Sequence, residues 1–171
     1  MAQEILNRVN GWALYAHPFF IRRLEALTSD VERAAVKEPQ RFHQHPSYKL
    51  LDAVAENILI KVPADPTSPA YRQGNTLGRT NRHWFRVKKQ GMAPRYRLFF
   101  QFRAYGPQAI IYAWLNDDST PRKEGDKRDA YAAFASLLRS QKVASSFNDL
   151  LAQSTPYEAC SQKLEAEDQL P

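Results

Sequence analysis

Basic side chains at every second position of two neighbouring runs are the first chemical signal in this 171-residue sequence. Arg86 and Lys88 alternate with apolar residues in one run, and Arg95, Arg97 and Arg103 alternate with mostly apolar residues in the next. Alternation with a period of two is typical of half-buried strands, so the runs predict a hairpin with a cationic face. Because a guanidinium group holds two phosphate oxygens in a fixed geometry, this face is suited to binding a nucleic acid.

RNA cleavage without a metal is the chemistry that such a face could perform. The 2′-hydroxyl of RNA attacks the neighbouring phosphate, and cations at the developing charge usually make the largest contribution. We expect Arg97 to hold that charge, with Arg86 and Lys88 reaching the same phosphates. The hairpin carries no carboxylate, so Lys88, His83 or Tyr131 would transfer the protons. Simpler roles are also open, since His83 could make a structural hydrogen bond or stack on a base, and Tyr131 could pack in the core.

The charge of the chain is strongly segregated. No aspartate or glutamate occurs from Pro66 to Asn116, and nine of the 24 basic residues lie there. Subtracting these nine leaves 15 basic residues against all 18 acidic ones, so the cationic surplus belongs to this middle segment. Such segregation is typical of a surface that meets phosphates, with a merely solvated basic face as the alternative. The side chains expected to bind RNA are Arg82, Lys89, Arg95, Arg103, Lys127 and Arg128.

The sequence predicts no metal site and no cofactor. A two-metal nuclease needs several converging carboxylates. The acidic residues around Asp117 and Asp118 are too few and too loosely spaced to form such a site. The histidines lack ligand partners at useful spacing. Cys160, the single cysteine, excludes an internal disulfide and is expected to be an unreactive thiol.

Helices are predicted before and after the cationic hairpin. Apolar residues at alternating steps of four and three indicate one helix over residues 18–37 and a second that ends near Val62. A third helix over residues 127–140 should pack on the sheet. Ser146, three residues before Asp149, predicts the start of a short fourth helix by its capping pattern.

Three strands lie between the second and third of these helices. They are predicted at residues 84–88, 95–103 and 109–115. The last run is apolar on both faces, so we expect a central strand. The order of elements predicts an α+β domain with an antiparallel sheet.

One domain over residues 1–155, followed by a polar tail at 156–171, is the expected organisation, because the chain is too short for two ordinary domains. No stretch approaches the roughly 20 apolar residues needed to cross a bilayer, and the first residues lack the apolar core of a signal peptide. We therefore expect a cytoplasmic protein that does not enter a membrane.

Three blocks of the sequence resemble the YhaV family of toxins. They are residues 8–18 (RVNGWALYAHP), residues 95–100 (RYRLFF), and Trp114–Asp118 (WLNDD) followed by Asp129–Tyr131 (DAY). Together with Trp84-x-Arg86-Val87-Lys88 they run in family order over about residues 8–140. A match this long and ordered is more specific than one short motif.

The resemblance implies a fold and a function. The family is similar to the RelE-like toxins of type II toxin–antitoxin systems, which combine two N-terminal helices, a twisted antiparallel sheet and a C-terminal helix. Their strand motif falls here on Tyr96-Arg97-Leu98. The resemblance implies a ribosome-associated endoribonuclease that cuts messenger RNA during translation and inhibits growth. It also implies a PrlF-type antitoxin as partner, with an AbrB-like swapped-hairpin domain that binds DNA.

Two other functions remain open from the sequence. A toxin similar to the ParE group would use the same scaffold without catalysis, against a topoisomerase. A plain RNA- or ribosome-binding module would use exposed aromatic residues among its arginines as stacking platforms. Most aromatic residues of the predicted hairpin fall on its apolar face, which disfavours the binding module.

Overall fold

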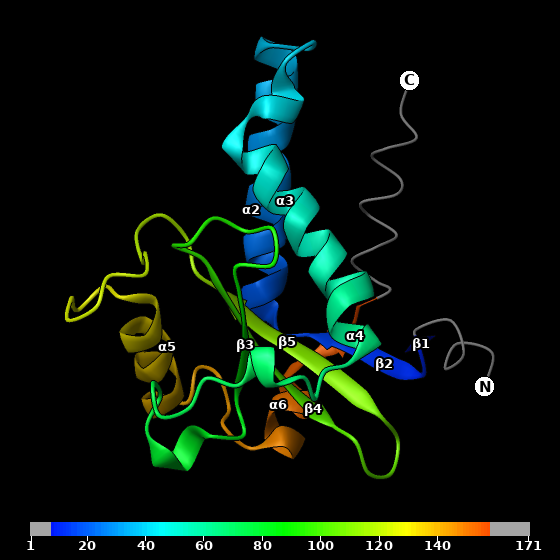
Figure 1. The fold of residues 1–171 in the computed structure, drawn as a ribbon, viewed down its shortest axis with the longest axis vertical. Coiled ribbons are helices and arrows are strands. Elements are labelled where there is room, and N and C mark those ends of the chain that lie inside the picture. The colour runs from blue at the N-terminus through cyan, green and yellow to red at the C-terminus, as the bar shows by residue number, and fades with distance from the viewer. Residues whose placement is uncertain (1–7, 158–171) are drawn as a thin grey trace.

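A mixed six-stranded sheet forms the centre of the protein (Figure 1). The computed structural model describes residues 8–157. The strands lie in the order β1-β2-β5-β4-β3, and β6 pairs with β2. Their bounds are β1 Arg8–Val9, β2 Trp12–Ala16, β3 Phe85–Lys88, β4 Arg97–Arg103, β5 Ala109–Leu115 and β6 Thr155–Pro156. The α+β class and the central position of β5 are thus confirmed.

The expectation of a purely antiparallel sheet is wrong, because β2 runs parallel to β5. Ala13 lies opposite Ala109, and Ala16 lies opposite Tyr112. β2 is not predictable from local periodicity, because its residues Trp12–Ala16 are all apolar or aromatic and show no polar alternation. Its partner β5 is distant in the sequence, so local periodicity carries no signal for the pairing.

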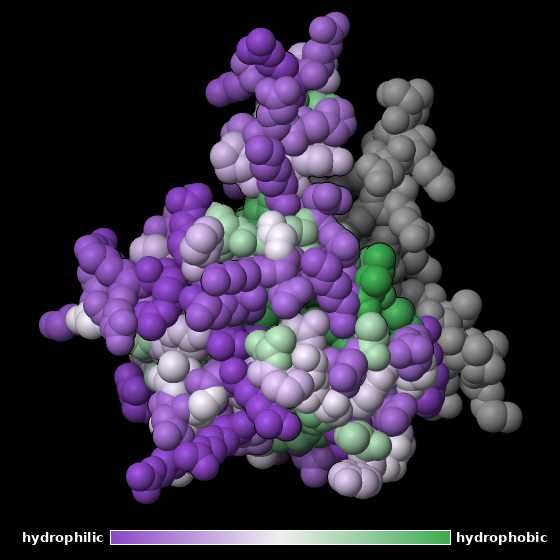
Figure 2. Space-filling view, in the orientation of Figure 1, coloured by the Kyte–Doolittle hydropathy of each residue, from purple (hydrophilic) through white to green (hydrophobic). Residues whose placement is uncertain are grey.

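A helical hairpin covers one face of the sheet and projects beyond it (Figure 1). On α2 the buried side chains are Phe20, Leu24 and Leu27, all in the first half of the helix. The projecting part is almost entirely hydrophilic on the side seen in Figure 2. The predicted bounds of the first helix and the predicted end of the second are confirmed. The segments are α2 Pro18–Lys37, α3 Pro46–Glu56, a π-helix at Asn57–Lys61 and α4 Val62–Ala64.

Two further helices, α5 Ala130–Arg139 and α6 Phe147–Gln153, pack on the opposite face. Asp129 caps α5 through its side chain, so this helix begins three residues later than predicted. Ser146 caps α6 and accepts a hydrogen bond from the N–H of Asp149, which confirms the predicted capping pattern. Short 3-10 turns occupy Phe42–Gln44, Pro69–Tyr71 and Arg79–Asn81.

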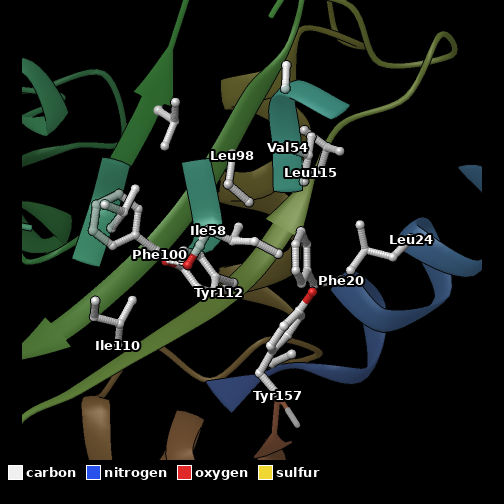
Figure 3. Packing of buried hydrophobic residues seen from close by; sticks show 14 of the residues in the cluster. Phe20, Leu24, Val54, Ile58, Leu98, Phe100, Ile110, Tyr112, Leu115 and Tyr157 are labelled. Carbon is white, nitrogen blue, oxygen red and sulfur yellow. Dashed lines mark hydrogen bonds between the residues drawn. The ribbon is translucent and has the colours of Figure 1, made fainter. Parts of the chain in front are cut away.

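The sheet separates two hydrophobic cores, and β4 supplies both. Leu98 and Phe100 face the helical hairpin, where they pack near Tyr112 and Phe20 (Figure 3). Phe99, between them, faces the other way and packs with residues of α5 and α6. Because successive strand residues point to opposite faces, the aromatic run in β4 binds both helical layers to one strand.

The described chain ends within the sheet. Pro156 belongs to β6, and the N–H of Tyr157 donates to the carbonyl of Leu14. The rest of the predicted tail, with Cys160, lies outside the described residues. Within residues 8–157 no helix is long and apolar enough to cross a membrane.

His17 links the two helical layers at the start of α2. Its Nδ1 accepts a hydrogen bond from the N–H of Phe19, and its Nε2 lies 3.1 Å from Oε1 of Gln153 on α6. Because Nδ1 is an acceptor, Nε2 carries the proton and donates to Gln153. Only 3% of His17 is exposed, and burial lowers the pKa of its imidazole.

We expect acidification to destabilise the protein through His17. Below the ordinary pKa of about 6.5 the unfolded chain takes up a proton that the folded protein still excludes, so unfolding becomes easier as the pH falls toward the lowered pKa. Well above the ordinary pKa of about 6.5, His17 should add no pH dependence to the free energy of unfolding. Urea denaturation between about pH 7.5 and pH 5 should show a steeper loss of unfolding free energy for the native protein than for His17→Asn, which keeps a capping oxygen. Equal slopes would contradict this.

Phe134 should be among the most sensitive core positions. Its ring stacks 4.2 Å from that of Phe99 and meets Trp84 edge-on at 4.8 Å. Removing the ring in Phe134→Ala should lower the free energy of unfolding by about 3–5 kcal/mol, because buried contacts are lost and a cavity remains. Val36→Ala, at a side chain that is 82% exposed, should change it by less than about 0.5 kcal/mol. Urea denaturation of both variants measures the difference.

Candidate active site

The hydroxyl group of Tyr131 is the meeting point of two guanidinium groups. Nε of Arg86 donates to this oxygen at 3.0 Å, and Nε of Arg97 donates to it at 3.1 Å. A phenol oxygen that accepts two hydrogen bonds still has its own hydrogen to donate. The site therefore holds a proton donor between two fixed positive charges.

Strand register explains why the three cations of the hairpin come together. Lys88 lies opposite Arg97, and Arg86 lies opposite Phe99 across the β3–β4 pair. Directly opposed residues in neighbouring strands share a face, so Arg86, Lys88 and Arg97 lie on the side that α5 covers. The predicted placement of these three residues on one face of the hairpin is thus confirmed, while their role in binding phosphates stays a prediction.

Arg97 does not lie on an open surface, so the expectation of a bare cationic face is wrong at this position. Only 4% of the residue is exposed, because α5 covers this end of the sheet. Its Nη1 donates to the carbonyls of Pro94 and Tyr96 at 2.7 and 2.8 Å. The alternation in β4 gives the face on which Arg97 lies, but it contains no information about the helix that covers this face.

No carboxylate neutralises the paired guanidinium groups. Of the ion pairs in the described part of the chain, none involves Arg86 or Arg97. Two like charges that meet at one neutral oxygen repel each other, most strongly where water is excluded. An anion bound beside Tyr131 would offset this repulsion.

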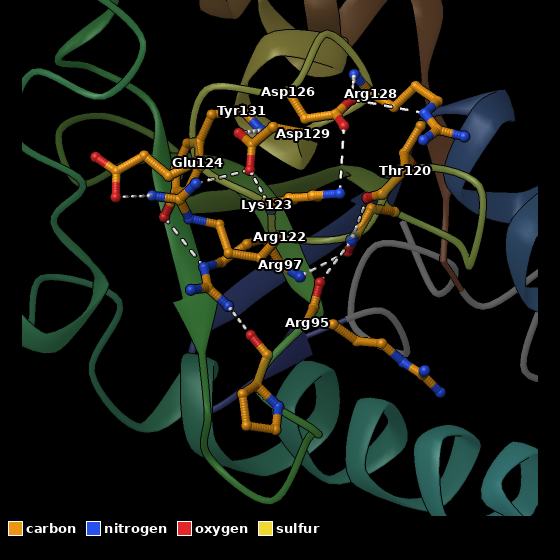
Figure 4. A network of polar contacts seen from close by, with 12 residues as sticks. Arg95, Arg97, Thr120, Arg122, Lys123, Glu124, Asp126, Arg128, Asp129 and Tyr131 are labelled. Carbon is orange, nitrogen blue, oxygen red and sulfur yellow. Dashed lines mark hydrogen bonds and ion pairs between the residues drawn. The ribbon is translucent and has the colours of Figure 1, made fainter.

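Arg122 completes the cluster and was missed by the sequence analysis. Its guanidinium carbon lies 4.9 Å from the centre of the Tyr131 ring, and its Nη1 lies 2.7 Å from Oδ1 of Asp129 (Figure 4). Asp129 is 5% exposed and also accepts the N–H of Tyr131, which fixes the first turn of α5. Arg122 lies in an irregular loop, where periodicity gives no signal.

Asn116 holds the strand ends in place and was also missed as a functional position. Its Oδ1 accepts the N–H of Arg97 at 2.6 Å, and its Nδ2 donates to the carbonyls of Arg95 and Thr120. Its own carbonyl accepts Nε of Arg23 from α2. This fully buried amide therefore positions Arg97 and the loop that carries Arg122. The Trp114–Asp118 block pointed to this segment without indicating that role.

The π-helix fixes the turn between β3 and β4. Asn57 and Lys61 both donate to the carbonyl of Gln90. Lys89 and Gln90 have positive φ angles of 63° and 52°, so the turn is strained for side-chain-bearing residues and needs such support. The widened helical turn thereby fixes the register that places Lys88 opposite Arg97.

A cavity of about 610 Å³ is lined in part by Tyr131, which is itself buried. Arg122, Lys127 and Arg139 bring positive charge to its lining, and Glu124, Asp126 and Asp129 bring an equal number of carboxylates. Asp126 accepts the N–H of Arg128, which lowers the pKa of its carboxyl group. This cavity offers access from solvent to the Tyr131 ring and to Arg122.

His83 is not part of this cluster. Its Nε2 lies 2.7 Å from the carbonyl oxygen of Ser145, which also accepts the side chain of Gln101. Gln101 lies four residues along β4 from Arg97, about 13 Å at the rise of a strand. The structure therefore does not bring His83 to Tyr131. His83 precedes β3, at the end of this strand opposite to the one where Lys88 faces Arg97.

The expected RNA-binding side chains are spread over the surface. Arg103 stacks on Phe147 at 4.9 Å, at the far end of β4 from Arg97. Arg82 donates to Asn75 at 2.8 Å. Arg103 therefore lies away from the Tyr131 cluster, whereas Arg82 contacts Asn75, whose neighbours Thr76 and Leu77 line the cavity beside Tyr131.

The remaining predicted cations are exposed at the surface or form surface ion pairs. Lys89 is exposed in the turn after Lys88. Arg95 pairs with Asp118 at 3.7 Å, and Arg128 pairs with Asp126 at 3.5 Å. Lys127 is exposed at the cavity beside Tyr131. Between residues 8 and 157, histidine, cysteine and acidic side chains form no group of three that could hold a metal ion.

The fold and this site define a small α+β protein with a tyrosine held among arginines at a strand end. The family model of the YhaV toxins, described as toxins with endonuclease activity of a toxin–antitoxin system, matches residues 14–155. The chain therefore belongs to the YhaV toxin family. It is 43% identical over 134 residues to the ribonuclease toxin YhaV of Escherichia coli strain K12 and to the toxin YhaV of Escherichia coli O157:H7. The match covers 78% of this chain and 85% of each relative, and no solved structure matches the chain.

Tyr131→Phe should destabilise the protein without unfolding it. The substitution keeps the ring but removes the oxygen that accepts from Arg86 and Arg97, and a buried donor without a partner costs about 1–3 kcal/mol. Urea denaturation measures the loss, and circular dichroism checks that the fold is retained. Tyr105→Phe, at a side chain that is 90% exposed, is the matched control and should leave stability unchanged. Equal stability of Tyr131→Phe and the native protein would contradict the shared hydrogen bonds.

Proposed function

We propose that this protein is an endoribonuclease toxin that cleaves messenger RNA during translation without a metal ion. The observation that carries the proposal is the Tyr131 hydroxyl held between Arg86 and Arg97 with no compensating carboxylate in the described chain. The family description and the name of the K12 relative, a ribonuclease toxin, support the same reaction. A phosphodiester is an anion of suitable size and charge for this place.

Cleavage would proceed through the 2′-hydroxyl of the RNA. Its oxygen bonds to phosphorus, the bond from phosphorus to the 5′ oxygen breaks, and a 2′,3′-cyclic phosphate is left. We assign Tyr131 as the donor of the proton that the 5′ oxygen needs, because its hydrogen is the one not committed to the two arginines. The phenolate that forms would be stabilised by the two guanidinium groups already in hydrogen-bond contact.

The cations divide into two roles in this proposal. Arg97 is nearly buried and acts through Tyr131, whose oxygen it contacts. Arg86 and Arg122 are partly exposed and hold the phosphate, with Lys127 at the mouth of the cavity. Lys88, opposite Arg97 in register, is the candidate to accept the 2′ proton in its neutral form. A preorganised set of donors of this kind stabilises the extra charge of the transition state.

The biological setting is proposed from the family. A toxin of a toxin–antitoxin system requires an antitoxin, and we propose a PrlF-type protein with an AbrB-like domain. We further propose that the ribosome presents the messenger RNA, that the protein acts in the cytoplasm, and that its fold is a variant of the RelE-like fold. The helical hairpin followed by three consecutive antiparallel strands, β3, β4 and β5, supports the last point.

Tyr131→Phe should abolish most cleavage. Loss of a positioned proton donor costs about 10²–10⁴-fold in rate. Primer-extension mapping in a translation extract, and separately on naked RNA with and without EDTA, compares the native protein, Tyr131→Phe, Arg97→Ala and Arg103→Ala. Cuts should vanish with the first two variants, while Arg103→Ala should weaken affinity but keep the single-turnover rate, because Arg103 lies far from Tyr131.

Each alternative predicts a different result. Growth arrest without new cuts would contradict the nuclease and favour a toxin similar to the ParE group. Equal losses for Arg97→Ala and Arg103→Ala, confined to affinity, would favour a binding module. Cleavage that EDTA removes would contradict independence from metal.

A further inference from the structure

A second cavity, of about 480 Å³, lies at the same strand end but on the opposite face of the sheet. Arg23 and Asp30 of α2, His45, Arg95 and Asp118 are among the residues that line it. It shares no lining residue with the cavity beside Tyr131. The proposed nuclease chemistry does not use this cavity.

The two cavities are nevertheless joined through the backbone. Tyr96, which lines the second cavity, directly precedes Arg97 in the chain. Asn116 binds the N–H of Arg97 on one side and the side chain of Arg23 on the other. A strand of RNA whose phosphate lies beside Tyr131 could therefore pass the end of β4 and place its next nucleotide in the second cavity.

Donors for a phosphate or ribose are present in this cavity. Nδ1 of His45 accepts the N–H of Ser47, so its Nε2 carries a proton that it can donate. The guanidinium group of Arg95 lies over the ring of Tyr96 at 5.1 Å. Arg23 is anchored through its Nε alone, which leaves its terminal nitrogens free of protein hydrogen bonds within residues 8–157.

Three carboxylates also line this cavity, those of Asp30, Asp117 and Asp118. Oδ1 of Asp118 accepts the hydroxyl of Tyr96 at 2.8 Å and lies 3.7 Å from Arg95. Its Oδ2 accepts no hydrogen bond from the described chain, and the side chain is 77% exposed. Oδ2 of Asp117 likewise accepts no hydrogen bond from the described chain, but its Oδ1 is held within its own turn by Ser119 and Thr120, whereas Asp118 is held by Tyr96 of the cavity wall.

We propose that this cavity binds the nucleotide next to the scissile phosphate and that Asp118 selects a base with an exocyclic amino group. The inference rests on the proposed nuclease function. A carboxylate oxygen accepts from the exocyclic amino groups of cytosine (N4), adenine (N6) and guanine (N2), whereas uracil has no exocyclic amino group and presents a carbonyl oxygen at the position of N4. Tyr96 positions the carboxylate, and burial together with the hydrogen bond to Asp118 raises the pKa of Tyr96, which keeps it a donor.

Sequencing of the ends produced from an RNA pool randomised around the cut tests this proposal. The native protein should disfavour uracil at one position that flanks the cut. Asp118→Asn should raise the ratio of uracil to cytosine there by about fivefold, because an amide can donate to uracil and one exposed hydrogen bond contributes about this factor. Asp52→Asn, which removes an exposed charge from α3, should keep the native profile.

The outcomes separate this inference from the proposed function. An unchanged base profile of Asp118→Asn with intact cleavage would overturn the assignment of Asp118. If the native protein does not cleave, the nuclease proposal fails. Binding of 2′-O-methyl oligonucleotides, which cannot be cut, then tests whether the cavity binds a nucleotide and selects its base. Fluorescence anisotropy should show that cytosine is preferred over uracil by the native protein and by Asp52→Asn but not by Asp118→Asn, and equal affinities for the two bases would overturn the proposal.

Discussion

The buried side chain of Asn116 is the constraint on which both cavities depend. Its amide group satisfies the N–H of Arg97 and the carbonyls of Arg95 and Thr120, and its carbonyl anchors Arg23. One residue at the end of β5 thus joins the first helix, the start of β4 and the loop that leads to α5. A buried polar network of this kind is costly if any member is missing, so its complete satisfaction fixes a single arrangement of the strand ends.

The positive charges gathered around Tyr131 lower the local stability of the folded protein. Three guanidinium groups surround the Tyr131 ring and hydroxyl group. Within residues 8–157, carboxylates pair with Arg122 alone among them: Asp129, which is committed to the cap of α5, and the exposed Glu124. A site with excess positive charge and little solvent is unfavourable until an anion enters it. The same repulsion that destabilises the empty site therefore favours the bound phosphate, as expected where function is obtained at the expense of stability.

Much of the framework could be predicted from the sequence, since it depends on local periodicity. The alternation of Arg86, Lys88 and Arg97 placed them on one face of a hairpin, and the apolar spacing gave the exact span of α2. The parallel strand β2 could not be predicted, because its partner is distant and its residues lack polar alternation. The burial of Arg97 and the contact of Arg122 with Tyr131 arise from the packing of α5 and an irregular loop, which no repeating pattern encodes.

The parallel pairing of β2 also orders events during synthesis. This strand is made early and first meets only the two-residue β1, whereas its other partners, β5 and β6, come much later, and the N–H of Tyr157 donates to the carbonyl of Leu14. The edge of β2 that pairs with β5 therefore stays open in a nascent chain until residues 109–115 have emerged, and long-range pairing of this kind slows folding. The cluster around the Tyr131 hydroxyl group joins side chains of β3, β4 and α5, so it can form only after this long-range partner of β2 has also been made.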